Sequence, residues 1–274
     1  MPAVSVVIPT YKHRDFILDT VNSVLSQTFR DFEIIVVNDG SPDDTASLLR
    51  PMAESGMIRY VEQSNAAAAA ARNRGLEMAR GKFIAFLDDD DLWPQDKLEW
   101  QVLALSNSPD LSVIGGALCV IDKNGNELEV LLANDRMITF ESLFSGNPFY
   151  SPGQTLIRTD RFRAIGGFDT SIWGADDLDA WFRLRQTGEL KFVNRIALRY
   201  RQHPLNASND VRRIATQSLK VMKRHVRSAA PVQQRLLMAR GRLYLYKYVF
   251  KKTLINWSAF RVGAPAYRSE CRLG

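Results

Sequence analysis

Cysteine is scarce in this 274-residue chain, which contains only Cys119 and Cys271. Two cysteines so far apart do not make a disulfide framework, and Cys119 lies in an apolar segment typical of a core strand, so we expect a reducing compartment, the cytoplasm. An uncharged apolar run of about 18 residues is also missing, which excludes an ordinary membrane-spanning helix. The first residues contain no basic segment followed by an apolar stretch, so we expect no signal peptide.

Two phosphate-binding motifs are missing as well. No G-x-G-x-x-G follows the first apolar segment, and G-x-x-x-x-G-K-S/T does not occur anywhere. Dinucleotide-dependent dehydrogenases and P-loop NTPases hold phosphates with these motifs. Their absence argues against both classes of enzyme.

Acidic residues are nearly absent from the last quarter of the chain. Residues 210–274 contain 15 Lys and Arg against 2 Asp and Glu, a net charge of +13. Residues 1–209 contain the other 21 basic and 28 acidic residues, a net charge of −7. We therefore predict a large N-terminal domain (1–209) and a separate basic region (210–274). An apolar content of 46% is ample for a core.

Apolar segments of strand length alternate with segments of helical periodicity in the N-terminal domain. The expected strands are Val4–Pro9, Phe32–Val37, 57–62, 82–87 and Leu111–Ile121. The expected helices are Phe16–Gln27, 43–54, one from Ala67 onward and 95–107, and a hairpin turn is expected at 122–126. This order predicts an α/β fold with a mainly parallel sheet, flanked by helices through right-handed crossovers.

Polar residues follow three of these strands, at Thr10-Tyr11, Asn38-Asp39 and Asp88–Asp91. Because the carboxyl ends of parallel strands meet at one edge of a sheet, we expect these groups to converge. Adjacent carboxylates repel one another unless a cation lies among them, so the aspartates predict a divalent-metal site for a phosphorylated ligand. If the strand continued, Asp88 and Asp90 would share one face. The alternative is a solvated acidic turn.

Four blocks of sequence resemble the signature of family 2 glycosyltransferases. They are Val4–Tyr11, Val36–Ser41, Ala71–Gly75 and Phe86–Trp93, in the family's order and spacing. The resemblance covers about residues 3–210. It implies an inverting, metal-dependent enzyme of the GT-A fold.

The resemblance also implies roles for single residues on the donor side. Thr10, Tyr11 and Asp39 would bind the base and ribose of a nucleotide, and Arg72 would lie near that nucleotide. Asp88 and Asp90 would bind Mn²⁺ or Mg²⁺ and the diphosphate. Asp90 would be the direct metal ligand.

A second acidic pair, Asp176-Asp177, opens an expected helix after Gly174. From the local sequence alone, such residues are usually there to complement the helix dipole. The resemblance instead implies that Asp177 is the general base for an acceptor hydroxyl and that Asp176 orients the acceptor. It also implies that His203 contacts the leaving diphosphate.

The chain departs from the family pattern in three places. Alanines (66–71) stand where a glycine and a hydroxyl residue usually precede A-R-N, which leaves the shape of the donor pocket open. Four aspartates stand in place of D-S-D-D. Asp176 stands where glutamate is usual, which leaves the identity of the acceptor open.

Two basic helices, Val211–Arg227 and Val232–Lys252, are expected in the C-terminal region. The second has a broad apolar face formed by Leu236, Leu237, Leu243, Leu245, Tyr246, Val249 and Phe250. This face fits an anionic membrane surface, and it fits equally well packing on the catalytic domain or on a sister subunit. No nucleic-acid reader motif accompanies the charge, so we expect no nucleic-acid binding.

Taken together, these features predict a cytoplasmic glycosyltransferase, with peripheral association at the inner face of the cytoplasmic membrane and oligomerisation left open. The predicted reaction moves a sugar from a nucleoside-diphospho-sugar, most simply a UDP-sugar, to a hydroxyl of a glycan or lipid-linked acceptor. The alternative is a non-catalytic protein that retains the GT-A fold and binds a nucleotide sugar or a membrane.

Overall fold

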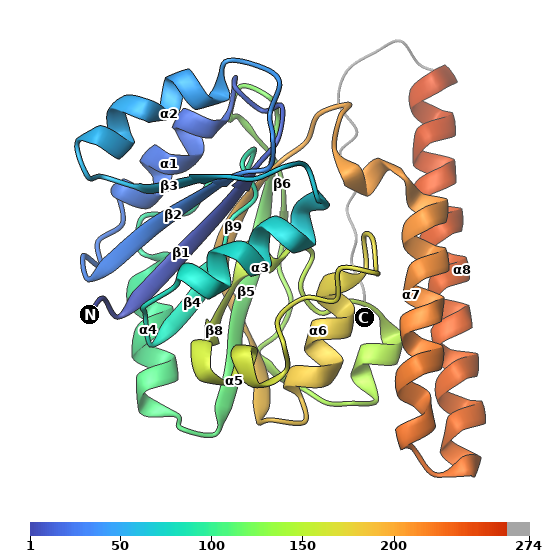
Figure 1. Ribbon diagram of the computed structural model, residues 1–274. Coiled ribbons are helices and arrows are strands. Elements are labelled where there is room, and N and C mark those ends of the chain that lie inside the picture. The colour runs from blue at the N-terminus through green and yellow to red at the C-terminus, as the bar shows by residue number, and fades with distance from the viewer. Residues whose placement is uncertain (262–274) are drawn as a thin grey trace.

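The computed structural model describes the backbone of residues 1–261 and the side chains of residues 1–252 (Figure 1). One sheet runs through the molecule, in the strand order β3-β2-β1-β4-β8-β5-β9-β7, and β6 pairs with β5. Its strands are β1 (Val4–Thr10), β2 (Phe32–Asn38), β3 (Arg59–Glu62), β4 (Phe83–Phe86), β5 (Leu111–Ile121), β6 (Glu127–Leu131), β7 (Arg136–Ile138), β8 (Thr155–Arg158) and β9 (Glu189–Arg201).

The first half of the sheet is parallel, as predicted. Strands β2, β1 and β4 lie side by side in the same direction, with β3 parallel to β2. The second half is mixed, because β8 is antiparallel to both of its neighbours while β9 is parallel to β5. Strand β9 was not predicted from the sequence, because charged residues interrupt its apolar pattern.

Helices cover both faces of this sheet (Figure 1). They are α1 (Ile17–Leu25), α2 (Thr45–Glu54), α3 (Ala67–Met78), α4 (Lys97–Asn107), α5 (Thr159–Ala164), α6 (Asp176–Leu184), α7 (Val211–His225) and α8 (Pro231–Arg261). Alternate residues of β1 enter two cores: Val6 and Ile8 pack in one cluster with residues of α1, α2 and α4, and Val7 packs in another with residues of α3, α5 and α6. The period of two in the strand sequence thus produces a sheet covered on both faces.

The two C-terminal helices form a hairpin beside the rest of the molecule (Figure 1). Helix α7 begins after Asp210, whose side chain accepts a hydrogen bond from the Arg213 amide at 3.1 Å. Met222 of α7 and Leu237 of α8 belong to the same buried cluster as Trp181 of α6. Helix α7 therefore begins next to the residue at which the charge changes, and the α7–α8 hairpin packs on the rest of the chain through a shared apolar core. Among the described helices, none is long and apolar enough to cross a membrane.

Helix α3 lies unusually close to β1 at Gly75. A Cβ atom at this position would lie 2.2 Å from Cγ1 of Val7. This contact explains why a glycine ends the A-R-N-R-G block. Arg72 lies one turn earlier in the same helix, so the contact also fixes how far Arg72 lies from the sheet.

The substitution Gly75→Ala is expected to destabilise the fold by about 1–3 kcal/mol, the usual cost of forcing extra atoms into a packed core. Alanine's better helix propensity, up to about 1 kcal/mol, offsets part of this loss. Chemical denaturation measures the free energy of unfolding, and Arg74→Ala at an exposed position of the same helix is the control. Equal stability of the Gly75→Ala protein and the wild type would contradict the close contact.

Candidate active site

The four aspartates lie in the loop after β4, because that strand ends at Phe86. The condition for Asp88 and Asp90 to share a strand face is therefore not met. The Oγ1 of Thr20 lies within hydrogen-bond distance of the carbonyl oxygens of Asp89 (3.0 Å) and Asp91 (2.9 Å), which holds the loop against α1. The four carboxylates then point to different partners.

Asp91 has a structural role that its sequence neighbours do not share. Its side chain is fully buried and accepts a hydrogen bond from the Arg201 amide at 2.8 Å, which ties the loop to β9. Burial raises the pKa of Asp91 well above its ordinary value. The Nε of Arg201 donates to the Asp90 carbonyl oxygen at 2.8 Å, and the guanidinium lies over the ring of Phe16.

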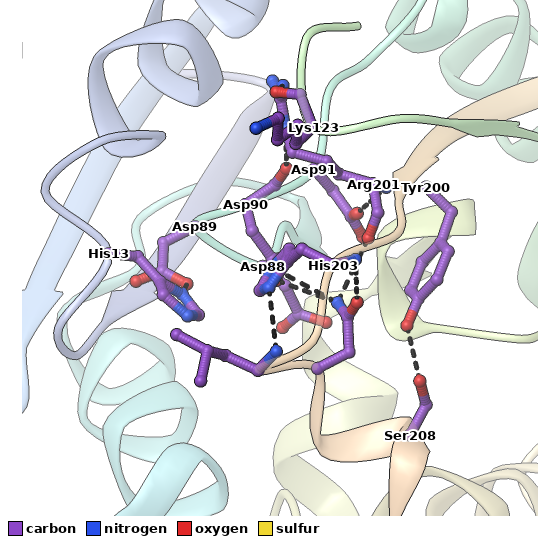
Figure 2. Close-up of polar contacts among 12 residues, drawn as sticks. His13, Asp88, Asp89, Asp90, Asp91, Lys123, Tyr200, Arg201, His203 and Ser208 are labelled. Atoms are coloured by element: carbon purple, nitrogen blue, oxygen red, sulfur yellow. Dashed lines mark hydrogen bonds and ion pairs between the residues drawn. The ribbon is translucent and has the colours of Figure 1, made fainter. Parts of the chain in front are cut away.

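Asp90 lies between two histidines (Figure 2). Its Oδ2 lies 2.9 Å from Nε2 of His203 and 3.3 Å from Nδ2 of Asn206. Ligand atoms of His13, Asp90 and His203 all lie within 4.8 Å of one another. His203 is also buried and stacks on Phe16, with 5.1 Å between the ring centroids.

His13 adds positive charge on the other side of the loop. Its Nδ1 lies 2.7 Å from Oδ1 of Asp89. Burial opposes its protonation, but the hydrogen bond to Asp89 and the charges of the neighbouring aspartates outweigh burial and raise the pKa of His13 to about 9. Nδ1 is thus committed to Asp89, and Nε2 can bind a metal ion only once that ion displaces its proton.

This group of side chains fits a divalent cation. Two imidazoles and a carboxylate suit a transition metal such as Mn²⁺ better than Mg²⁺, which prefers an all-oxygen site. Asp88 does not belong to the group, because its carboxylate contacts Arg72 and Ser151 instead. Its predicted role as a metal ligand stays a prediction, as does that of Asp90.

Arg72 connects the aspartate loop to the second acidic pair. Its NH2 donates to Oδ1 of Asp88 at 2.5 Å, and its NH1 donates to Oδ2 of Asp176 at 3.2 Å. The guanidinium is buried and lies 5.5 Å from the ring centroid of Phe168. The charges of both carboxylates outweigh the effect of burial and raise the pKa of Arg72.

Asp176 and Asp177 are not solvated capping residues. They are 7% and 8% exposed at the start of α6, whose N-cap is Ala175. Oδ2 of Asp177 accepts a hydrogen bond from Nδ2 of Asn147 at 2.6 Å. Burial and the charge of Asp176 raise the pKa of Asp177 to about 7. A carboxylate with such a pKa can take a proton at neutral pH.

The residues expected to hold a nucleotide lie at the ends of β1 and β2. Thr10 is buried, and the ring of Tyr11 is partly exposed beside the aspartate loop, with its amide donating to Oδ2 of Asp89 at 3.0 Å. Oδ1 of Asp39 accepts from Nε2 of Gln63 (2.8 Å) and from the Ala66 amide (2.9 Å). These bonds hold the Asp39 carboxylate at the start of α3.

The alanine segment forms the turn into α3. Ala67 has a φ of +70°, a left-handed conformation that favours glycine. A glycine would adopt this φ without strain, whereas the alanine stores local strain.

Several polar residues of the site were not predicted from the sequence. His13, Asn147, Ser151 and Asn206 approach the aspartates only through tertiary contacts. The one available signal was the position of His13, three residues after Thr10 at a strand end. Asp179 was also missed: its buried carboxylate binds His225 at 2.8 Å and Arg183 at 2.7 Å, which joins α6 to α7.

Comparison with known proteins identifies this architecture. The family model described as Glycosyl transferase family 2 matches residues 5–166, more than half of the chain. The chain belongs to this family. A family 2 relative, the *Bacillus subtilis* (strain 168) glycosyltransferase TuaG named for teichuronic acid biosynthesis, is 35% identical over 191 residues, covering 68% of this chain and 73% of TuaG. The chain spans about a third of the length of three *Rickettsia* glycosyltransferases that it matches and about two thirds of two others.

Solved structures show that this family 2 chain has the GT-A fold. The *S. aureus* TarS 1-349 structure in complex with UDP-GlcNAc is similar with a TM-score of 0.71 at 17% identity, covering 87% of this chain and 71% of that one. The mannosyltransferase PcManGT from *Pyrobaculum calidifontis*, in complex with GDP-Man and Mn²⁺, has a TM-score of 0.65 at 20% identity, covering 96% of this chain and 76% of that one. At these identities the likeness shows the fold alone.

The substitution Asp90→Asn is expected to weaken Mn²⁺ binding by at least about tenfold, since a neutral amide cannot balance a divalent ion. Calorimetric titration with Mn²⁺, with and without UDP, measures the affinity, and the exposed Asp110→Asn is the matched control. The wild type should also prefer Mn²⁺ to Mg²⁺, because two of the three candidate ligands are imidazoles. Unchanged Mn²⁺ affinity in the Asp90→Asn protein would remove Asp90 from the metal site.

Proposed function

We propose that this protein is an inverting glycosyltransferase that moves a sugar from a nucleoside-diphospho-sugar, first of all a UDP-sugar, to a hydroxyl of a glycan or lipid-linked acceptor. The observation that carries this proposal is Asp177, a buried carboxylate with a pKa of about 7. Through Asp176 and Arg72, its helix contacts Asp88, next to the candidate metal ligands. These contacts support a proton acceptor close to a diphosphate site.

The donor would lie along the ends of β1, β2 and β4. Tyr11 offers a partly exposed ring for stacking on the base, and Asp39 offers its carboxylate to the base and ribose. TarS in complex with UDP-GlcNAc and PcManGT in complex with GDP-Man and Mn²⁺ share this fold, which supports a nucleotide-sugar donor and a Mn²⁺ cofactor.

The reaction would be one in-line displacement. Asp177 takes the proton of the acceptor hydroxyl as its oxygen forms a bond to the anomeric carbon. The bond from that carbon to the diphosphate oxygen breaks, and the electron pair leaves with the nucleoside diphosphate, which inverts the anomeric configuration. Asp90 and His203, with His13, would hold Mn²⁺, which when bound supplies positive charge against the departing diphosphate. Arg72 adds a fixed positive charge next to Asp88.

The alternative is a non-catalytic binder that keeps the fold. Slow hydrolysis of the sugar donor in the presence of Mn²⁺, with water in place of the acceptor, separates the two. A transferase shows this hydrolysis, whereas a binder shows none at any metal concentration. A panel of nucleotide sugars in the same assay identifies the donor.

The Asp39 site is expected to favour uracil over cytosine. The uracil ring has an N–H at position 3 that can donate a hydrogen bond to a carboxylate, and cytosine lacks this donor. CDP should therefore bind more weakly than UDP by about 1–3 kcal/mol, the cost of one unmade buried hydrogen bond. Calorimetry measures both affinities. Equal affinity would refute the role of Asp39 in recognising the base.

The substitution Asp177→Asn is expected to lower sugar transfer by about 10²–10⁴-fold with donor binding nearly unchanged, because the amide cannot take a proton. Asp176→Asn should instead raise KM for the acceptor more than it lowers kcat. Turnover per folded molecule is measured together with the melting temperature. Asp160→Asn, in the exposed first turn of α5, is the control for a plain effect on a helix dipole. Wild-type turnover in folded Asp177→Asn protein would show that Asp177 is not the general base.

A further inference from the structure

Helix α8 exposes a stripe of apolar residues along its outer side. We call this set the α8 stripe: Val232, Leu236, Ala239, Leu243, Tyr246 and Phe250. Its members are separated alternately by four and three residues, so they lie along one side of a helix. Leu236 is 68% exposed and Tyr246 is 69% exposed, and the rings of Tyr246 and Phe250 stack on one another.

The α8 stripe is not the face that holds α8 to the protein. Leu237 and Leu245 lie on the opposite side and are buried in the core cluster. Between them, a Cβ at Gly241 would lie 2.7 Å from Sδ of Met222 in α7, so the two helices approach closely there. The apolar residues predicted to form one face of this helix therefore lie on two faces. One face is packed on the protein, and the other, the α8 stripe, contacts solvent.

Positive charge borders the α8 stripe on both sides. Arg235 and Arg242 directly precede stripe residues, Arg240 and Lys247 directly follow them, and all four are exposed. Residues 211–252 contain 12 Lys and Arg and no Asp or Glu. The α8 stripe is thus an apolar surface inside a purely basic region.

This charge pattern argues against a second copy of the chain as the partner. If two α8 stripes faced one another, the Arg and Lys beside one stripe would lie opposite the Arg and Lys beside the other. This holds for parallel and for antiparallel helices. Like charges at these positions disfavour pairing. An anionic lipid bilayer fits both features of this helix. Its headgroups are negatively charged and match the flanking Arg and Lys, and the acyl chains beneath them match the apolar stripe.

We propose that the α8 stripe docks the protein on an anionic membrane. The stripe residues would enter the boundary between headgroups and acyl chains, and the flanking Arg and Lys would pair with the anionic headgroups. No membrane-crossing segment is needed for this contact.

Docking through α8 would hold the acceptor side of the site near the lipid. Tyr244 of α8 packs on Gly146, where a Cβ would lie 2.5 Å from its ring, and Nζ of Lys252 lies 3.4 Å from the Tyr150 hydroxyl. The same loop carries Asn147, which bonds Asp177. A lipid-linked acceptor would then meet the base at the membrane surface, a consequence that rests on the proposed function. The docking itself does not rest on it.

Co-sedimentation of the full chain with vesicles tests the proposal. The protein should bind vesicles of phosphatidylcholine with about 30% phosphatidylglycerol, and it should bind vesicles of phosphatidylcholine alone much more weakly. Raising the salt from about 0.05 M to about 0.5 M should weaken binding, because screening shortens the reach of the charges. The triple variant Leu236→Gln, Leu243→Gln and Phe250→Gln should lose at least about tenfold in binding.

A matched control replaces three equally exposed apolar residues elsewhere, Met57→Gln, Leu103→Gln and Leu128→Gln, which are 54%, 61% and 59% exposed. This control should bind vesicles like the wild type. Both variants should keep the wild-type melting temperature and Mn²⁺-dependent donor hydrolysis, which separates failure of docking from failure of the proposed reaction.

Three results would overturn the proposal. The wild type could ignore anionic vesicles at low salt, in which case the α8 stripe serves another partner. The triple variant could bind as well as the wild type, in which case the basic residues act without the stripe. Sedimentation could also show a wild-type dimer that the triple variant abolishes, in which case a second copy covers the stripe.

Discussion

The structure depends on one buried guanidinium, that of Arg72, which contacts Asp88 after β4 and Asp176 at the start of α6. The two carboxylates are 88 positions apart in the sequence. Asp176 is buried, which is costly for a carboxylate without an opposite charge. Arg72 suits this position because its planar, always charged fork can serve two carboxylates at once. The close approach of α3 to β1 at Gly75 sets where that fork lies. The loop after β4 and the start of α6 are therefore joined by packing as well as by charge.

The other three aspartates of the loop have different partners. Asp89 is paired with His13, and Asp91 is buried on the amide of Arg201, while Asp90 lies between His13 and His203 with one imidazole bond and a weak amide contact. A divalent cation bound by Asp90 would supply an opposite charge to this carboxylate. At the other end, burial and the charge of Asp176 keep the pKa of Asp177 near neutrality. Adjacent carboxylates thus differ in protonation and in contacts because their partners differ.

The sequence predicted what depends on local pattern and on the geometry of parallel sheets. Strands β1, β2 and β4 and the helices between them followed from periodicity, and the convergence of Thr10, Asp39 and Asp88 at one edge followed from their parallel order. Partners that arrive from distant loops could not be predicted, because nothing local marks them. Asn147 reaches Asp177 across 30 residues, and Arg201 reaches Asp91 across 110. The exposed and packed faces of α8 could not be told apart either, since both are apolar and only the positions of α7 and of the segment 142–146 separate them.

The pH dependence of donor turnover tests most directly whether burial and the charge of Asp176 make Asp177 a base that works at neutral pH. Mn²⁺-dependent hydrolysis of the nucleotide sugar should fall about tenfold per pH unit below about pH 7, where Asp177 becomes protonated. In the Asp176→Asn protein this acid limb should move to lower pH, because the charge that raises the pKa of Asp177 has been removed. A profile that is flat from about pH 5 to 8, or an acid limb that Asp176→Asn leaves in place, would contradict the account.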